Sequence, residues 1–319
     1  MVDLQRERPF GRTGFPITGL TLGTSSWGPA KAGESDAERD ARIAELASAF
    51  LRGALPTNAI DTSNIYGGSE AEAHIGRALA TAGGLGDGQL LQTKLDRDLA
   101  TGNFDGSQME HSLEQSLERL GVDRLQLLYL HDPEAIGFEA AMAPGGPVEA
   151  LVAMKERGVA ATIGISGGPV GMLTQFVETD IFDALISHNR FTLVDRSADA
   201  LYDAATARNV GIQNAATYGG GVLTGDARFA GSYGYAPIRP EVQAAVTAVE
   251  ELCREAGISI AAAALQFSLR DPRIHSTIVG VTSLARFDDL ERECAETIPD
   301  GFWDAVDAVL PPASAALDA

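Results

Sequence analysis

The chain has 319 residues, of which 45% are hydrophobic and 21% are charged, as is ordinary for a globular protein with a sizeable core. Its 44 acidic residues outnumber its 24 basic residues, so the net charge at pH 7 is −20. A phosphate backbone or an anionic membrane surface would repel such a chain, which argues against nucleic acids and membranes as partners.

The cysteines and the N-terminus show no sign of secretion. Cys253 and Cys294 form neither a redox motif, nor a metal-binding pair, nor a disulfide framework, so we expect no metal. The N-terminal segment is polar overall and has no apolar stretch of the kind found in a signal peptide, and no apolar run approaches the roughly 20 residues of a membrane helix. The sequence therefore predicts a cytoplasmic protein.

Eight short apolar segments alternate with longer amphipathic segments. The predicted strands are 20–24, 58–62, 90–94, 125–131, 161–166, 184–189, 210–215 and 277–281. The predicted helices are 37–52, 69–80, 108–120, 147–157, 169–178, 197–207, 240–256 and 283–294. This alternation is typical of parallel strands, and no early strand is followed by Gly-x-Gly-x-x-Gly. Eight repeats without that fingerprint favour an α/β fold of the (β/α)8 TIM barrel type over a Rossmann domain.

Three segments depart from the alternation. Residues 8–18 predict a β-hairpin, with its turn at Arg12-Thr13-Gly14, that would close the bottom of the barrel. Residues 217–239 predict a long loop of the kind that often covers a binding site, and residues 258–271 predict an extra helix late in the chain. Since there is no linker-like tract, we expect one domain over residues 1–319, with the barrel at about 20–295 and a C-terminal tail at about 296–319.

Four polar residues follow three consecutive predicted strands. Asp61 ends the second strand and Tyr66 lies five positions later, Lys94 ends the third strand, and His131 ends the fourth. Active sites of (β/α)8 barrels lie where the C-terminal ends of the strands meet. Each residue alone is unremarkable as a cap or a solvated charge, but the four together predict an acid–base site.

The chemistry of this set is coherent. Tyrosine has an ordinary pKa near 10 and is a poor proton acceptor at neutral pH, and an adjacent ammonium of Lys94 is expected to lower that pKa. Asp61 would keep Lys94 charged, since a buried ammonium without a partner is costly. Tyr66 would then exchange a proton with the reacting oxygen, while His131 would donate a hydrogen bond to the same oxygen.

The arrangement resembles the catalytic tetrad of the aldo-keto reductases. The resemblance extends from Arg8 to about Cys294 and includes the hairpin, the Asp-x4-Tyr spacing, Gly-Gly-Ser-Glu at 67–70, and the run at 120–131 that ends at His131. It implies a nicotinamide dinucleotide bound across the barrel mouth without a Rossmann fold. The residues that match the cofactor-binding positions of the family are Ser166, Asn189, Leu223, Gly225, Gly280, Thr282, Ser283, Arg286 and Asp289.

Some positions depart from the family pattern. Relatives that prefer NADP often carry Lys or Arg where this chain has Val281 and Thr282, which favours NAD, although Arg286 could still pair with a 2′-phosphate. Gly167 stands where relatives often have Asn. The tyrosine that stacks on the nicotinamide in many relatives has no clear counterpart, since Tyr218 lies beyond the matching stretch.

The run at 131–133 and the segment at 191–196 resemble a bacterial subgroup of NAD-dependent sugar 1-dehydrogenases and pyridoxal dehydrogenases. The resemblance implies oxidation of an aldose at C1 to a lactone, or of a similar small alcohol. The expected substrate contacts are Trp27, Asp132, Phe138 and Arg190, with loop packing as the alternative for Trp27. Two other functions stay open, an NADPH-dependent aldehyde or ketone reductase and a cofactor-binding sensor subunit. We expect a small-molecule substrate and a monomer or small homo-oligomer.

Overall fold

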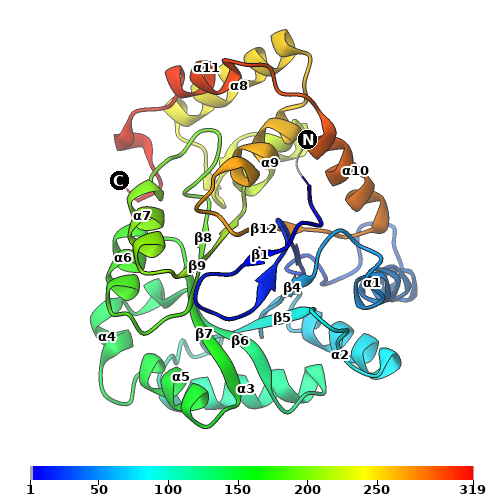
Figure 1. Cartoon of the computed structure of the whole chain (residues 1–319), viewed down its shortest axis with the longest axis vertical. Coiled ribbons are helices and arrows are strands. Elements are labelled where there is room, and N and C mark those ends of the chain that lie inside the picture. Colours follow the sequence, from blue (N-terminus) through cyan, green and yellow to red (C-terminus); the bar gives the residue numbers. More distant parts are fainter. Residues whose placement is uncertain (1–2, 319) are drawn as a thin grey trace.

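The computed structural model describes residues 3–318, and its centre is a closed barrel of parallel strands (Figure 1). The strands are β3 (Leu20–Gly23), β4 (Ala59–Asp61), β5 (Leu90–Leu95), β6 (Leu125–His131), β7 (Ala160–Gly167), β8 (Ala184–His188), β9 (Gly211–Ala215) and β12 (Ser276–Gly280). Each pairs with its neighbour in chain order, and β12 pairs with β3 to close the ring. The predicted (β/α)8 barrel is confirmed, with every strand boundary within one residue of its predicted position.

Helices surround the barrel (Figure 1). They are α1 (Asp36–Leu51), α2 (Ala71–Ala82), α3 (Gly106–Leu120), α4 (Phe138–Met142), α5 (Pro147–Glu156), α6 (Val170–Glu178), α7 (Asp199–Ala207), α8 (Pro240–Ala256), α9 (Ile260–Arg270), α10 (Leu284–Ala295) and α11 (Phe302–Ala308). The predicted extra helix is α9. The sequence analysis missed α4 and α11 because elements this short show almost no periodicity.

The alternation of side chains along the strands divides the core into two layers. In β5, Leu91 and Leu95 point outward and pack in the large cluster between the barrel and the helices. Leu90 points inward and belongs to a smaller cluster inside the barrel. Gln92 and Lys94 share the inward face with Leu90, so the same alternation carries polar side chains up the barrel axis.

The N-terminal hairpin closes the end of the barrel opposite the catalytic end. Its strands are β1 (Arg8–Pro9) and β2 (Pro16–Ile17), which pair antiparallel, and Figure 1 shows it in dark blue across the barrel. Phe10 and Ile17 are fully buried in the inner cluster, against Ala59, Leu90 and Leu127. The predicted hairpin is therefore confirmed, and its apolar residues complete the inner core.

The predicted loop at 217–239 has local structure of its own. It contains the 3-10 turns η2 (Gly219–Thr224) and η3 (Ala227–Phe229) and a small hairpin of β10 (Ser232–Tyr233) and β11 (Ala236–Pro237). The other 3-10 turns are η1 (Pro133–Ala135) and η4 (Ala313–Ala315). Within residues 3–318, no helix has the length and apolar character to cross a membrane.

Candidate active site

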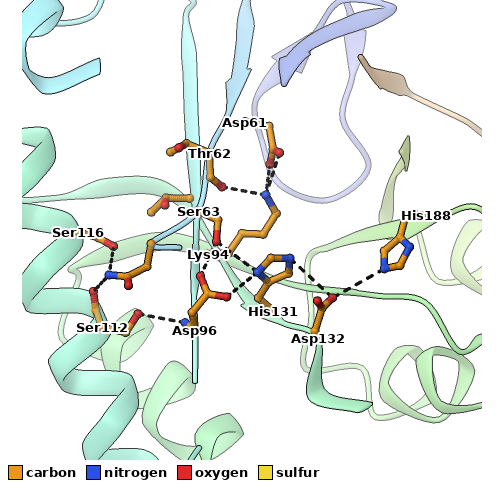
Figure 2. A network of polar contacts seen from close by, with 12 residues as sticks. Asp61, Thr62, Ser63, Lys94, Asp96, Ser112, Ser116, His131, Asp132 and His188 are labelled. Atoms are coloured by element: carbon orange, nitrogen blue, oxygen red, sulfur yellow. Dashed lines mark hydrogen bonds and ion pairs between the residues drawn. The ribbon is translucent and has the colours of Figure 1, made fainter. Parts of the chain in front are cut away.

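The four predicted acid–base residues converge at the C-terminal ends of β4, β5 and β6. The Lys94 Nζ donates to Asp61 Oδ1 and Oδ2 at 2.7 and 2.8 Å, and to the Thr62 carbonyl at 2.8 Å (Figure 2). Asp61 and Lys94 are almost fully buried, so the two charges must neutralise each other. Asp61 also accepts from Gln92 Nε2 at 2.8 Å, which holds the carboxylate from below.

Tyr66 lies beside this pair, in the turn after β4. The Lys94 Nζ lies 4.4 Å from the centroid of the Tyr66 ring, and the ring meets His131 edge-on with centroids 5.6 Å apart. Parallel strands deliver these side chains to one rim because their C-terminal ends face the same way. The structure thus brings the four residues together as expected, while their catalytic roles stay predictions.

A chain of polar contacts extends from His131 in both directions. On one side, the His131 Nδ1 lies 2.6 Å from Asp96 Oδ1, and the Ser63 hydroxyl donates to Asp96 Oδ2. On the cavity side, Asp132 Oδ1 lies 3.6 Å from the His131 Nε2 and 3.7 Å from the His188 Nε2. Figure 2 shows Asp132 between the two imidazoles.

These contacts set the charges of the site. Burial lowers the pKa of His131, but the carboxylates of Asp96 and Asp132 outweigh burial, and the pKa ends above its ordinary value. Burial likewise raises the pKa of Asp132, yet His131 and His188 bring that pKa down to about 2.

The pKa of Tyr66 differs from the sequence-based expectation. Burial and the nearby carboxylates of Asp61, Asp96 and Asp132 raise it well above its ordinary value. The expected lowering by Lys94 is absent from the net result because Asp61 neutralises that ammonium at close range. In this structure Tyr66 is therefore a protonated phenol at neutral pH.

A cavity of about 710 Å³ opens above these residues. Asp61, Tyr66, Lys94 and His131 line its floor, and its walls come from the loops that follow the strands. This volume lies in the usual range for a cofactor or ligand site.

Three of the predicted cofactor residues line this cavity: Ser166, Gly280 and Thr282. Asn189 is fully buried at the end of β8, and its Oδ1 has no hydrogen-bond partner among the described residues. A buried amide oxygen without a partner is costly, and a carboxamide donor would satisfy it. Gly220 and Gly221 also line the cavity, with φ of 78° and 112°, which leaves backbone without side chains at this wall. These residues fit a nicotinamide dinucleotide.

The other predicted cofactor residues lie outside the cavity lining. Leu223 is fully buried in the outer core, and Gly225 ends η2 in the left-handed conformation. Ser283 precedes α10 as its N-cap residue, and Asp289 pairs with Arg292 on the same helix. Arg286 is held by Glu293 at 2.5 Å. Their cofactor roles stay predictions.

Of the four predicted substrate residues, only Asp132 lines the cavity. Trp27 is fully buried and donates from Nε1 to the Val281 carbonyl at 2.8 Å, which agrees with the alternative of loop packing. Phe138 packs on Phe176 with ring centroids 4.9 Å apart, which holds it in the helical layer.

Arg190 is also engaged away from the cavity. It donates from Nη2 to Asp318 Oδ1 at 2.7 Å, and Asp318 belongs to the C-terminal tail. A partner 128 positions away could not be read from the local sequence. None of Trp27, Phe138 and Arg190 lines the cavity, and their contacts with substrate stay predictions.

The sequence analysis missed three residues at the site: Asp96, His188 and Tyr235. Asp96 follows Lys94 by two positions and His188 follows Ile186 by two, so the strand alternation could have placed both on the inward face. Tyr235 lines the cavity at the tip of the β10–β11 hairpin, with its ring centroid 6.3 Å from that of His188. Tyr235 lies within the predicted binding-site loop at 217–239, but no sequence signal singled out that residue.

Asp132, Glu134 and His188 each offer a side-chain ligand atom, and these atoms lie within 4.8 Å of one another. One oxygen of Glu134 already accepts from the Gly168 amide at 3.1 Å. The expectation of a site without metal stays a prediction.

A (β/α)8 barrel with this tyrosine, lysine, aspartate and histidine at the strand ends defines a nicotinamide-dependent oxidoreductase. The chain belongs to the aldo/keto reductase family, whose model matches residues 19–311. It is an NAD(P)-dependent enzyme of that family.

Curated relatives agree with this assignment, and a solved structure agrees with the fold. The chain is 28% identical to L-galactose dehydrogenase of Arabidopsis thaliana over 88% of this chain and 86% of the relative. It is 32% identical to D-threo-aldose 1-dehydrogenase of a Pseudomonas species, over 60% and 58%, and 24% identical to pyridoxal 4-dehydrogenase of Microbacterium luteolum, over 93% and 95%. A structure from Pseudomonas aeruginosa assigned to the aldo-keto reductases superposes with a TM-score of 0.64 at 21% identity, over 91% of this chain and 94% of that one.

Proposed function

We propose that this enzyme oxidises the C1 hydroxyl of an aldose, or a similar small alcohol, with NAD as the hydride acceptor. The observation that carries the proposal is the position of Tyr66 between Lys94 and His131 on the floor of the cavity. The similarity to proteins named L-galactose dehydrogenase and D-threo-aldose 1-dehydrogenase supports a sugar as the substrate.

The charges at the cavity favour a neutral, hydroxyl-rich substrate. Asp132 and His188 line the wall of the cavity. A carboxylate accepts hydrogen bonds and an imidazole N–H donates one, so together they can bind adjacent hydroxyl groups. A phosphorylated or carboxylated substrate would meet the charge of Asp132, whereas the ammonium of Lys94 is already paired with Asp61. This balance disfavours anionic substrates.

In the oxidative direction, Tyr66 in its deprotonated form accepts the proton of the substrate hydroxyl while His131 donates a hydrogen bond to the same oxygen. The carbon loses its hydride and the oxygen becomes a carbonyl oxygen, which for an aldose gives a lactone. A bound, oxidised nicotinamide would supply the acceptor for that hydride and a positive charge at the site. Positive charge beside a phenol lowers its pKa, as the Tyr66 base requires.

One observation favours a second function, reduction of an aldehyde or ketone. The pKa of Tyr66 is raised by burial and nearby carboxylates, so the phenol of this structure is protonated and suited to donate a proton to a carbonyl oxygen. The two functions use the same residues in opposite directions.

The contacts of the Arg286 guanidinium support the proposed preference for NAD. The guanidinium contacts Glu293 Oε1 at 2.5 Å and the Tyr218 hydroxyl at 2.8 Å, and both side chains of the ion pair are mostly buried. A guanidinium neutralised in this way is a poor ligand for the 2′-phosphate that distinguishes NADP. This supports the sequence-based preference for NAD.

The test is a substrate panel assayed with NAD and with NADP, by the absorbance of the reduced nicotinamide. The panel contains L-galactose, a D-threo-aldose, D-arabinose and pyridoxal, together with their phosphorylated or acidic analogues. We expect turnover of neutral sugars with NAD. Turnover confined to NADPH-dependent reduction of carbonyl compounds would favour the second function, and turnover of none would remove both.

The matched control in this assay is Tyr66→Phe, which keeps the ring and removes the hydroxyl. We expect turnover to fall by about 10²–10⁴-fold, the usual contribution of a general acid–base group, with cofactor affinity nearly unchanged. Wild-type turnover in this variant would show that Tyr66 does not carry the proton.

A further inference from the structure

Asp96 forms a buried polar contact with His131 that the reaction described above does not use. The His131 Nδ1 lies 2.6 Å from Asp96 Oδ1, and the two residues are only 7% and 3% exposed. Asp96 and Asp132 lie on opposite sides of the imidazole (Figure 2), and of the two only Asp132 lines the cavity. Asp96 itself does not line the cavity, whereas His131 does.

The position of Asp96 is held by three neighbours. The Ser63 hydroxyl donates to its Oδ2, the Ser112 hydroxyl accepts from its backbone amide at 3.0 Å, and Gln108 Nε2 donates to its backbone carbonyl at 3.1 Å. Ser112 and Gln108 lie on α3, so the backbone of Asp96 is anchored to a helix after β5, while Ser63 holds its carboxylate. A side chain held this firmly can hold its partner.

We propose that Asp96 is a positioning residue, which keeps His131 as a protonated imidazolium and aims its Nε2–H at the reacting oxygen in the cavity. The proposal rests on the proposed function only in giving that oxygen a role. The contact with Asp96 occupies Nδ1, so the other ring nitrogen is the one presented to the substrate.

The charges around His131 agree with an imidazolium. The charged or titratable groups that face it are Lys94 on β5, Asp96 after β5, Tyr66 after β4 and Asp132 after β6. His188 contacts Asp132 and so adds to the same group of charges. Lys94 opposes the positive charge of His131, but its own charge is balanced by Asp61. Asp96 is the carboxylate nearest to His131, and a buried carboxylate requires a positive partner.

An imidazolium serves the reaction better than a neutral imidazole does. A charged N–H donor binds a developing alkoxide oxygen more strongly than a neutral donor does. The oxygen carries this partial negative charge in the transition state of either direction. Asp96 would therefore act on the rate of the chemical step rather than on substrate binding.

The test is Asp96→Asn, which retains an acceptor oxygen and nearly the same shape but removes the charge. The matched control is Asp132→Asn, which removes a carboxylate that lies near the other nitrogen of the same ring. We expect Asp96→Asn to lower kcat about 10- to 100-fold with little change in KM, because supporting residues typically contribute this much. The control should mainly raise KM for a hydroxyl-rich substrate.

The decisive readout is the charge of His131, measured without substrate by NMR titration of the imidazole nitrogens in protein labelled on histidine. The His131 signal is assigned by its loss in His131→Asn. We expect wild-type His131 to stay protonated at a higher pH than an ordinary histidine and to lose its proton at a lower pH in Asp96→Asn. The alkaline limb of the kcat profile should move in the same direction.

Two results would overturn the proposal: a wild-type His131 that is neutral at pH values where ordinary histidines are charged, or a folded Asp96→Asn with an unchanged His131 titration. The wild-type titration decides the question even where the variant fails to fold. The NMR result does not depend on substrate, so its failure can be told apart from failure of the proposed reaction.

Discussion

Two cations near the active site are each paired with a carboxylate. Lys94 pairs with Asp61, and Arg286 pairs with Glu293. Removing one partner of such a buried pair is destabilising, because the charge of the other partner stays buried without compensation. The consequence at the residue scale is that a charge visible in the sequence need not be available to a ligand, and Arg286 is the clearest case.

Glu293→Gln is expected to release Arg286 and to improve the use of NADP. The substitution removes the charge that neutralises the guanidinium while it keeps an oxygen near the Tyr218 hydroxyl. A charge-assisted contact contributes about 1.5–3 kcal/mol, so we expect the ratio of kcat/KM for NADP to that for NAD to rise by at least about tenfold. Initial rates with both cofactors measure this ratio.

The control for this prediction is Lys31→Met, because Lys31 donates to Thr282 Oγ1 at 3.2 Å near the same wall. We expect this variant to leave the wild-type preference for NAD unchanged. A wild-type enzyme that prefers NADP and loses this preference in Lys31→Met would contradict our assignment and would identify Lys31 as the phosphate ligand.

At the scale of elements, strands β6 and β7 pack closely because a large side chain on β6 lies beside a glycine on β7. Tyr129 on β6 fills the inner core and donates to Gln213 Oε1 at 2.8 Å. Gly164 on β7 lies beside its ring, and a Cβ at Gly164 would come within 2.3 Å of Tyr129 Cε1. The pairing of β6 with β7 therefore depends on the absence of that one carbon atom.

Gly164→Ala is expected to lower the free energy of unfolding by about 1–3 kcal/mol or more, the usual cost of overpacking a core. Gly171→Ala in α6 is the matched control, since nothing lies within 4 Å of its added Cβ. Because alanine favours helix over glycine, we expect this control to be stabilising by up to about 1 kcal/mol. Denaturant unfolding compares the two, and equal effects would show that the Tyr129 contact is relieved at no cost.

At the scale of the whole molecule, the net charge is −20, so many acidic residues stay without a basic partner even if every basic residue forms an ion pair. Such an excess makes the compact state repel itself, and dissolved salt screens this repulsion. The Debye length falls from about 30 Å at 0.01 M to about 10 Å at 0.1 M salt, so the repulsion acts over a shorter range as salt is added.

We therefore expect the midpoint of thermal unfolding to rise as NaCl is increased over that range. Sodium sulfate at equal ionic strength is the control, because screening alone predicts the same rise for both salts. A midpoint that falls with NaCl would mean that attractive ion pairs outweigh the net repulsion.

The sequence by itself determined the barrel, its hairpin and the rim on which the polar residues meet. Strand periodicity marks which residues begin and end each strand, and parallel strands in a closed barrel have one common C-terminal end. Asp61, Lys94 and His131 therefore had to lie near one another once the strands were identified. Their proximity follows from the barrel topology, and the sequence predicts that topology because its local patterns identify the strands.

Only the tertiary structure decided which partner each side chain has. Asp96, which follows β5, contacts His131 at the end of the neighbouring strand β6. Arg190 contacts Asp318 in the C-terminal tail, and the buried Trp27 donates to the Val281 carbonyl. The pKa of Tyr66 likewise depends on burial and on carboxylates from three segments. Such quantities sum over neighbours in space, and spacing along the chain does not determine the orientation of a side chain or the field around it.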